Sequence, residues 1–421
     1  MIRSRRLVPI AVAIALALAA CGGGSGGGGE GAPAEEGGTL TFANWQWLEP
    51  NRGDAIWESV TGYEEVNPEV TLKKQDIVRK DFENTLKTQM GAGGGPDLLV
   101  IPDSFFPELA EAGLLEPLDG ALDEEQVGAL NSTNEAGLWD GEQLAYSWEV
   151  VNYALFWNQA ILDQAGVQPP TTPEELVTAA QTITEKTGVP GFAVRHQMNE
   201  ETVWWTDFAN WPYGFGGEWS DGEQLTIDSP ENIEAVEAYK AVYDSGAFAI
   251  GDDASTFRSK FAQGEIAMMI DNSSALATMV TDNPTVPSTG VGSSALPFPT
   301  DKSAHVGVYV GINANSENKE LAKDWLNWYF TEEAQTTAAS ALGASAIGTD
   351  VEPAEAFVAA NPWVPVFKDQ AANSQSAVIV GFETQTPQIR TIILRQLARV
   401  LTEDLSPAEA LAAAQAEAEQ L

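Results

Sequence analysis

The segment from residue 306 to residue 335 constrains the fold of this chain more than any other. It opens with an apolar, β-branched run interrupted by Gly307 and Gly311, a pattern that predicts a strand approached closely by another backbone or a ligand. Turn-forming residues follow, with Ser316 as the expected N-cap of a helix. That helix carries a leucine and two tryptophans at i, i+4 and i+7, so one of its faces must be buried. Such a unit is also expected in ordinary α/β enzymes.

The beginning of the chain has the features of an export signal. Three arginines precede an apolar run at residues 7–20, which is too short to span a bilayer. The run ends in Leu-Ala-Ala followed by Cys21, which resembles a bacterial lipobox. This resemblance implies a lipoprotein signal peptide at residues 1–20, cleaved before Cys21, and a lipid such as palmitate on that cysteine. A simple secretory signal with a free cysteine is the alternative.

A glycine-rich stretch at residues 21–38 is expected to be a flexible tether. Together with the lipid it would hold an extracytoplasmic protein at the cell membrane without spanning it. Cys21 is the sole cysteine of the sequence, so no intramolecular disulfide can form.

The chain is strongly acidic, with 61 Asp and Glu against 21 Lys and Arg and a formal net charge of −40. A field of this sign repels nucleic acid and anionic lipid and disfavours anionic ligands. A neutral or cationic small ligand is therefore favoured. The acids are spread along the chain, so the charge also serves solubility.

Strand-like and helix-like segments alternate from Thr39 onward, which predicts a mainly parallel sheet with helices on both faces. A helix after Thr172 is predicted with Thr172 as its N-cap and Glu175 closing a capping box. The sequence has two histidines, no HExxH or Cys/His metal spacing and no G-x-S-x-G motif, so we expect no metal, no cofactor and no hydrolase elbow. A glycosidase with paired catalytic carboxylates stays an open alternative, because the distance between two acids in the sequence says little about their separation in space.

Five segments in order carry a family resemblance. They include PDLLVIPDSFFPELAEAGLLEPLD, YSWEVVNYALFWNQAILDQAGVQPPTTPEELVTAAQTI and INANSENKELAKDWL. These segments are similar to extracellular sugar-binding proteins of ABC importers, the maltose-binding type included. The resemblance implies a periplasmic-binding-protein-like α/β fold of class II, with two α/β lobes, mainly parallel sheets and a hinged cleft. The lobes would be residues 39–148 plus 307–350 and residues 149–306 plus 351–421.

This resemblance implies a binding protein and not an enzyme. A monomer would capture a sugar or oligosaccharide in the interlobe cleft and deliver it to the permease subunits of an ABC importer. A binder of a polyamine or peptide is one alternative, and a secreted carbohydrate-active enzyme is another. The sequence does not specify the sugar, its length or its linkage. A cleft lined by Lys and Arg would contradict an uncharged sugar.

Candidate ligand contacts are side chains that could stack on a sugar ring or bind its hydroxyl groups. They are Trp45, Gln46, Trp47, Asp103, Ser104, Trp148, Glu149, Trp204, Trp205, Asn272, Ser273, Tyr309, Phe382 and Glu383. Asp103 and Ser104 follow a strand, at the end where open α/β sheets bind ligands. Trp204 and Trp205 are expected just before a helix. Core packing is the alternative for the aromatic candidates.

Two further positions bear on this site. Ser274 stands where maltose-type proteins carry a stacking Trp, so the resemblance implies a different sugar or pose. Arg195 and His196 are either polar site groups or solvated loop residues.

Overall fold

The structure is a computed structural model that describes residues 38–49, 52–403 and 405–421. The predicted signal peptide, Cys21 and nearly all of the predicted tether lie outside the described residues, so these predictions stay predictions. Everything below concerns the unit Gly37–Leu421.

The strands are β1 (Thr39–Ala43), β2 (Thr71–Gln75), β3 (Leu98–Pro102), β4 (Leu138–Trp139), β5 (Glu142–Gln143), β6 (Tyr146–Asn158), β7 (Phe192–Ala193), β8 (Met268–Asn272), β9 (Val291–Ser294), β10 (Ser303–Ile312) and β11 (Ser374–Ser376). The α-helices are α1 (Gly53–Thr61), α2 (Tyr63–Val66), α3 (Phe82–Gly91), α4 (Phe106–Glu111), α5 (Glu124–Ala129), α6 (Gln159–Ala165), α7 (Pro173–Thr187), α8 (Glu201–Gly214), α9 (Pro230–Tyr243), α10 (Ala254–Ala262), α11 (Ser273–Val280), α12 (Lys319–Tyr329), α13 (Glu332–Leu342), α14 (Glu355–Ala360), α15 (Val364–Ala371), α16 (Thr386–Thr402) and α17 (Pro407–Ala418). The 3₁₀ helices are η1 (Trp45–Leu48), η2 (Arg79–Asp81), η3 (Ser132–Gly137), η4 (Met198–Glu200), η5 (Ser288–Gly290) and η6 (Glu383–Gln385).

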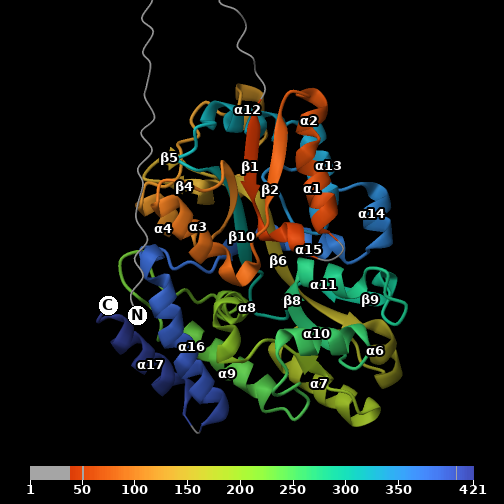
Figure 1. Cartoon of the computed structure of the whole chain (residues 1–421). Coiled ribbons are helices and arrows are strands. Elements are labelled where there is room, and N and C mark those ends of the chain that lie inside the picture. Colours follow the sequence, from red (N-terminus) through yellow and green to blue (C-terminus); the bar gives the residue numbers. More distant parts are fainter. Residues whose placement is uncertain (1–37, 50–51, 404) are drawn as a thin grey trace, which may run out of the picture. The chain divides into compact units, whose positions relative to one another are not determined.

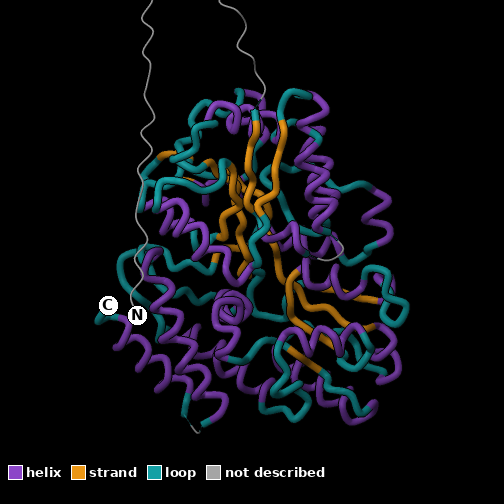
Figure 2. The backbone as a smooth tube through the Cα atoms, viewed as in Figure 1, coloured by secondary structure: helices purple, strands orange, loops and turns teal. Residues whose placement is uncertain are grey.

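Two long strands, β6 and β10, connect the two halves of the main sheet. Its order is β2-β1-β3-β10-β6-β8-β7, with β11 beside β10 and β9 beside β6. The pairs β1–β2, β1–β3, β7–β8 and β10–β11 are parallel, whereas the crossing strands β6 and β10 pair antiparallel with each other. Figure 1 shows β6 passing from the helices around α1 and α13 to those around α7 and α10. Figure 2 shows helices packed around the strands in both halves.

The buried apolar side chains form three clusters that follow this arrangement. The first core cluster draws on residues 40–148 and 308–347. The second draws on residues 153–304 and 377–418, and the third on residues 154–291 and 344–367. Because chain segments far apart in sequence return to the same cluster, we propose the division into two lobes at the bounds expected from the sequence.

The predicted strand–turn–helix unit is present, but one detail was wrong. The run with Gly307 and Gly311 lies in β10, and a Cβ on Gly311 would come within 3.2 Å of the Leu144 carbonyl oxygen, so the predicted close approach of another backbone is confirmed at this glycine. The helix α12 starts later than expected, with Asn318 and not Ser316 as N-cap. Ser316 Oγ instead donates to Asp97 Oδ1 at 2.6 Å, because this carboxylate lies beside the turn.

The aromatic face of α12 is buried as predicted. Trp325 is fully buried in the first core cluster, and Leu321 and Trp328 pack half-buried at its margin. The predicted start of the helix α7 is confirmed only in part. Thr172 caps α7 by accepting the Glu175 N–H at 3.2 Å, but the Glu175 carboxylate accepts from Thr171 and closes no capping box.

Candidate ligand-binding site

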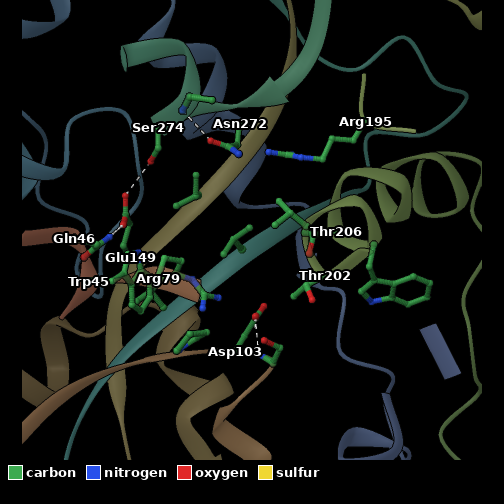
Figure 3. Close-up of a pocket in the computed structure, with 18 of the residues that line it drawn as sticks. Trp45, Gln46, Arg79, Asp103, Glu149, Arg195, Thr202, Thr206, Asn272 and Ser274 are labelled. Carbon is green, nitrogen blue, oxygen red and sulfur yellow. Dashed lines mark hydrogen bonds between the residues drawn. The ribbon is translucent and has the colours of Figure 1, made fainter. Parts of the chain in front are cut away.

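A cavity of about 600 Å³ lies where segments of the two proposed lobes meet. Its size falls in the range of small-molecule sites. The wall is made by residues 45–52, Arg79, 102–104, 149–151, Arg195, 202–206, 258–262, 272–279, 306–308, 377–378, 386 and 390, though not by every residue of these ranges. Figure 3 shows side chains from these separate segments turned toward one space.

About half of the candidate residues line this cavity. They are Trp45, Gln46, Asp103, Ser104, Glu149, Trp205 and Asn272. Their contact with a ligand stays a prediction. The Trp45 ring packs edge-on against Phe82 with centroids 4.9 Å apart, and the Arg79 guanidinium lies 4.8 Å from its centroid. Little of the Trp45 face is therefore free to stack on a sugar.

The other candidates lie outside the cavity wall. Trp148 is 1% exposed and stacks on Tyr329 with ring centroids 5.1 Å apart, while its Nε1 donates to Gln46 Oε1 at 2.8 Å. Trp204 lies inside α8 and not before a helix, as does its neighbour Trp205, and Trp204 is fully buried beside Tyr239. Both indoles therefore belong to the protein core.

The remaining candidates also have structural contacts. Trp47 packs on Phe42, and Tyr309 packs on Phe106, both in the first core cluster. Ser273 is buried near Ser345, with their hydroxyls 3.5 Å apart.

Phe382 and Glu383 lie together at the start of η6, also outside the cavity wall. Phe382 is half-buried against the second core cluster. The Glu383 carboxylate accepts the Gly381 N–H at 2.8 Å.

Glu149 is the centre of the Glu149 network, which we define as Glu149 with Gln46, Arg52, Ser274 and Ser345. The Glu149 carboxylate is fully buried on β6. It accepts hydrogen bonds from Gln46 Nε2 at 2.5 Å, Arg52 Nη1 at 2.7 Å, Ser345 Oγ at 2.7 Å and Ser274 Oγ at 3.3 Å. A carboxylate has about four lone-pair sites, so this one has little capacity left for a ligand.

Asp103 follows β3 and is also occupied by protein donors. Its oxygens accept from the Ser104 N–H at 2.7 Å, the Gly307 N–H at 3.1 Å and Ser376 Oγ at 2.8 Å. Burial raises the pKa of Asp103 above its usual value, although these three donors oppose the shift.

Arg195 is the centre of the Arg195 network, which we define as Arg195 with Tyr153, Glu200 and Asp207. Arg195 Nη1 donates to Asp207 Oδ2 at 2.5 Å, and its Nε lies 3.4 Å from Glu200 Oε1. Tyr153 donates its hydroxyl to Asp207 Oδ1 at 2.6 Å. Burial raises the pKa of Asp207 to about 6, while the Arg195 charge opposes that shift.

A second ion pair lies close to the Arg195 network. Arg258 donates through Nε and Nη2 to the two oxygens of Asp271 at 2.7 and 2.8 Å. Burial disfavours the charged form of Asp271, but Arg258 and Arg195 keep the pKa of this carboxyl below its usual value. The wall of the cavity is thus held by buried, paired charges.

Sequence reasoning missed most of the arginines in this wall. They are Arg52, Arg79, Arg195, Arg258 and Arg390, of which only Arg195 was considered. They come from separate segments, so no local motif could have grouped them. His196, considered beside Arg195, is buried outside the cavity wall, and its Nδ1 donates to the Val194 carbonyl at 3.0 Å.

The described residues form neither a metal site nor a membrane-spanning helix. Among them, no group of three or more His, Cys, Asp and Glu side chains is arranged to hold a metal ion. None of the helices in the described ranges has the length and apolar character needed to cross a membrane.

Comparison with known proteins gives consistent matches. A family model described as bacterial extracellular solute-binding protein matches residues 47–336. A binding protein of Brucella abortus is 27% identical over 290 residues, covering 67% of this chain and 69% of the relative. The diacetylchitobiose binding protein of Streptomyces coelicolor is 27% identical over 274 residues, covering 62% of this chain and 63% of that relative.

Solved structures match over nearly the whole chain. The GacH receptor of Streptomyces glaucescens, solved unliganded and with acarbose, superposes with a TM-score of 0.80 at 24% identity, covering 91% of this chain and 98% of that one. At this identity the likeness shows the fold. The predicted periplasmic-binding-protein-like α/β fold is therefore confirmed.

Proposed function

The chain belongs to the bacterial extracellular solute-binding proteins, and we propose that it binds a carbohydrate in the cavity and delivers it to an ABC permease. The observation that carries this proposal is the cavity itself, because its wall combines residues of both proposed lobes. Periplasmic binding proteins close hinged lobes around their ligands. The relatives named above include a diacetylchitobiose binder and a receptor solved with acarbose, which favours a sugar ligand.

The chemistry of the wall suits a polyhydroxylated molecule. Amide and hydroxyl groups of Gln46, Asn272, Thr206 and Ser104 lie around the space, and Trp205 adds part of an indole. Trp205 is held in place because its Nε1 donates to the Ala377 carbonyl at 2.8 Å. Polar contacts, more than stacking, would then bind the sugar.

Ligand capture would depend on β6 and β10, which run through both halves of the sheet. Closure about these strands would exclude water from the bound sugar and strengthen each polar contact. It would also place surfaces of both lobes together for the permease. Binding and release, without a chemical step, are the whole proposed activity, as in the matched family.

A thermal-shift screen of the full chain tests the proposal. The panel contains neutral and charged oligosaccharides, short peptides and polyamines such as spermidine. A bound sugar at 100 times its Kd should stabilise the chain by ~2.7 kcal/mol and raise Tm. Stabilisation by spermidine or a peptide alone, or turnover of an oligosaccharide during incubation, would contradict it.

We also propose that the protein is extracytoplasmic and held at the cell membrane by a lipid on Cys21. Location outside the cytoplasm follows from the matched extracellular family, whereas the anchor depends on the lipobox-like sequence. A Cys21→Ser variant should lose incorporated palmitate and leave the membrane fraction. Sedimentation equilibrium should give a monomer for the same variant.

A further inference from the structure

The arginines in the cavity wall are paired with carboxylates that mostly lie outside it. Arg52 is the exception, because its partners Glu49 and Glu149 line the cavity. The other four arginines pair with Glu83, with Glu200 and Asp207, with Asp271 and with Glu201, and none of these acids lines the cavity. These four arginines therefore border the ligand space, whereas their partner acids do not.

Two of these guanidinium groups have N–H donors to spare. Arg195 uses Nε and Nη1 for Glu200 and Asp207, and no described residue accepts from its Nη2. Arg258 uses Nε and Nη2 for Asp271, which leaves Nη1. Figure 3 shows the Arg195 side chain pointing toward Asn272 in the cavity wall. A guanidinium has five N–H donors, so both can bind a further acceptor.

The other two arginines, Arg79 and Arg390, have weaker contacts with protein acceptors. Arg79 has one ion pair, to Glu83 at 3.0 Å, between side chains that are 45% and 36% exposed. Figure 3 shows Arg79 close to Trp45 at the ligand space. Arg390 Nη2 donates to Thr202 Oγ1 at 3.2 Å, but its buried Nε has no hydrogen-bond partner in the described part of the chain, with Glu201 Oε1 at 3.5 Å.

Acceptors for the ligand are scarce in the same wall. The Glu149 carboxylate already receives four donors and Asp103 receives three, as described above. Glu49 keeps one oxygen free, on a side chain that is 33% exposed. Each hydroxyl of a neutral sugar can accept such a bond but also brings an O–H donor that needs an acceptor in this wall, whereas an oxyanion only accepts.

We propose that the carbohydrate carries an oxyanion, a carboxylate or a phosphate, and that Arg79 and Arg390 bind it. This inference rests on the proposed function of the cavity as a sugar site. Arginine binds such groups with paired, charge-assisted N–H donors. The negative charge of the whole chain does not oppose this, because screening limits exposed charges to about 8 Å at physiological salt, whereas the arginines lie at the ligand itself.

Matched pairs of sugars test the proposal by calorimetry on the full chain. Digalacturonate is compared with its dimethyl ester, and glucose 6-phosphate is compared with glucose; inorganic phosphate alone is included. An acidic sugar should bind at least about tenfold more tightly than its neutral counterpart. Its Kd should rise several-fold between 20 and 500 mM NaCl, since salt screens the ion pair. The two pairs separate a carboxylate from a phosphate ligand.

Arginine variants assign the effect to this wall. Arg79→Gln and Arg390→Gln should each weaken binding of the acidic sugar about tenfold more than they weaken binding of its neutral counterpart. Arg395→Gln is the matched control, since Arg395 lies on α16 like Arg390 but pairs with Glu417 at the surface. That variant should bind like the unchanged chain.

The outcomes separate this inference from the proposed function. Neutral sugars that bind as tightly as every acidic counterpart, unaffected by the two variants, would overturn the inference and support the function. Binding of phosphate with equal affinity without any sugar would overturn the carbohydrate part. A panel in which no carbohydrate binds would contradict both.

Discussion

The Glu149 network and the Arg195 network each stabilise a buried charge, and the two charges have opposite signs. In the first, a carboxylate is the centre and four donors from separate segments surround it. In the second, a guanidinium is the centre, and its acceptors are Asp207 and Glu200. Both charges are buried, and both need partners to offset the cost of leaving water.

The difference lies in what each centre keeps for a ligand. Three of the four donors converge on Glu149 Oε1 and only Gln46 reaches Oε2, so Glu149 acts as a structural tie between segments and keeps accepting capacity at Oε2 alone. A guanidinium with two acceptors still has N–H donors directed away from them. A wall built from both networks therefore offers the ligand more donors than acceptors.

Replacing Arg195 should have the largest effect on stability. Arg195→Met leaves Asp207 buried without its cation, and the loss of one partner of such a pair costs ~3–5 kcal/mol. Urea denaturation measures the free energy of unfolding. The double variant with Asp207→Asn should recover part of the loss, because the uncompensated charge is gone. A single variant as stable as the unchanged chain would show that Arg195 is not the centre of its network.

Glu149→Gln should cost somewhat less, about 2–4 kcal/mol by the same measurement. The amide keeps the shape but turns an NH₂ toward donors. Arg52 loses its buried partner but retains Glu49, and its side chain is 15% exposed, so it can reach water. Glu83→Gln, which removes an exposed ion pair with Arg79, is the control and should change stability by less than ~0.5 kcal/mol. Equal losses in both variants would contradict the central position of Glu149.

The buried, neutral His305 should make the stability of the fold depend on pH. Burial lowers the pKa of His305 to about 4, although its hydrogen bond with Ser374 opposes this. The unfolded histidine titrates near 6.5, so the unfolded state takes up the proton first and stability falls as pH decreases from 6.5 to 4. The loss should reach about 2 kcal/mol, less than the full shift implies because His305 is only half-buried.

The variant His305→Gln isolates this contribution. Asp207 titrates in the same range with the opposite sign, because its raised pKa makes stability fall as pH increases from about 4 to 6. Subtracting the pH profile of His305→Gln from that of the unchanged chain removes the Asp207 effect. A flat difference between pH 4 and 6.5 would show that His305 is accessible to protons when folded.

The sequence predicted the elements and the fold, because hydrophobic period and turn residues are local signals. The sequence did not predict the direction in which each side chain points. Trp204 and Trp205 are neighbours on α8, yet one lies in the core and the other at the cavity, since successive helical residues point about 100° apart.

On strands the corresponding problem is which face meets the cavity. Trp148 and Glu149 are neighbours on β6, yet the Trp148 indole packs in the first core cluster and the Glu149 carboxylate lines the cavity, so a pair proposed together as ligand contacts is divided between core and cavity. The pairing of Arg258 with Asp271, by contrast, depends on how α10 packs beside β8. Such long-range pairings set the charge of the wall, and no spacing in the sequence reveals them.

The smallest expected effects compare two serines that donate to the same oxygen of Glu149. Ser345 is 4% exposed and its Oγ lies 2.7 Å from Oε1, whereas the Ser274 Oγ lies 3.3 Å away on a side chain at the cavity. Ser345→Ala should cost about 1 kcal/mol, and Ser274→Ala about 0.5 kcal/mol, because water can replace the second donor but not the first. Urea denaturation of the two variants and of their double variant gives the coupling between them. If Ser274→Ala cost more than Ser345→Ala, the cavity side of Glu149 would be the better-paired side, and this carboxylate would have capacity for a ligand after all.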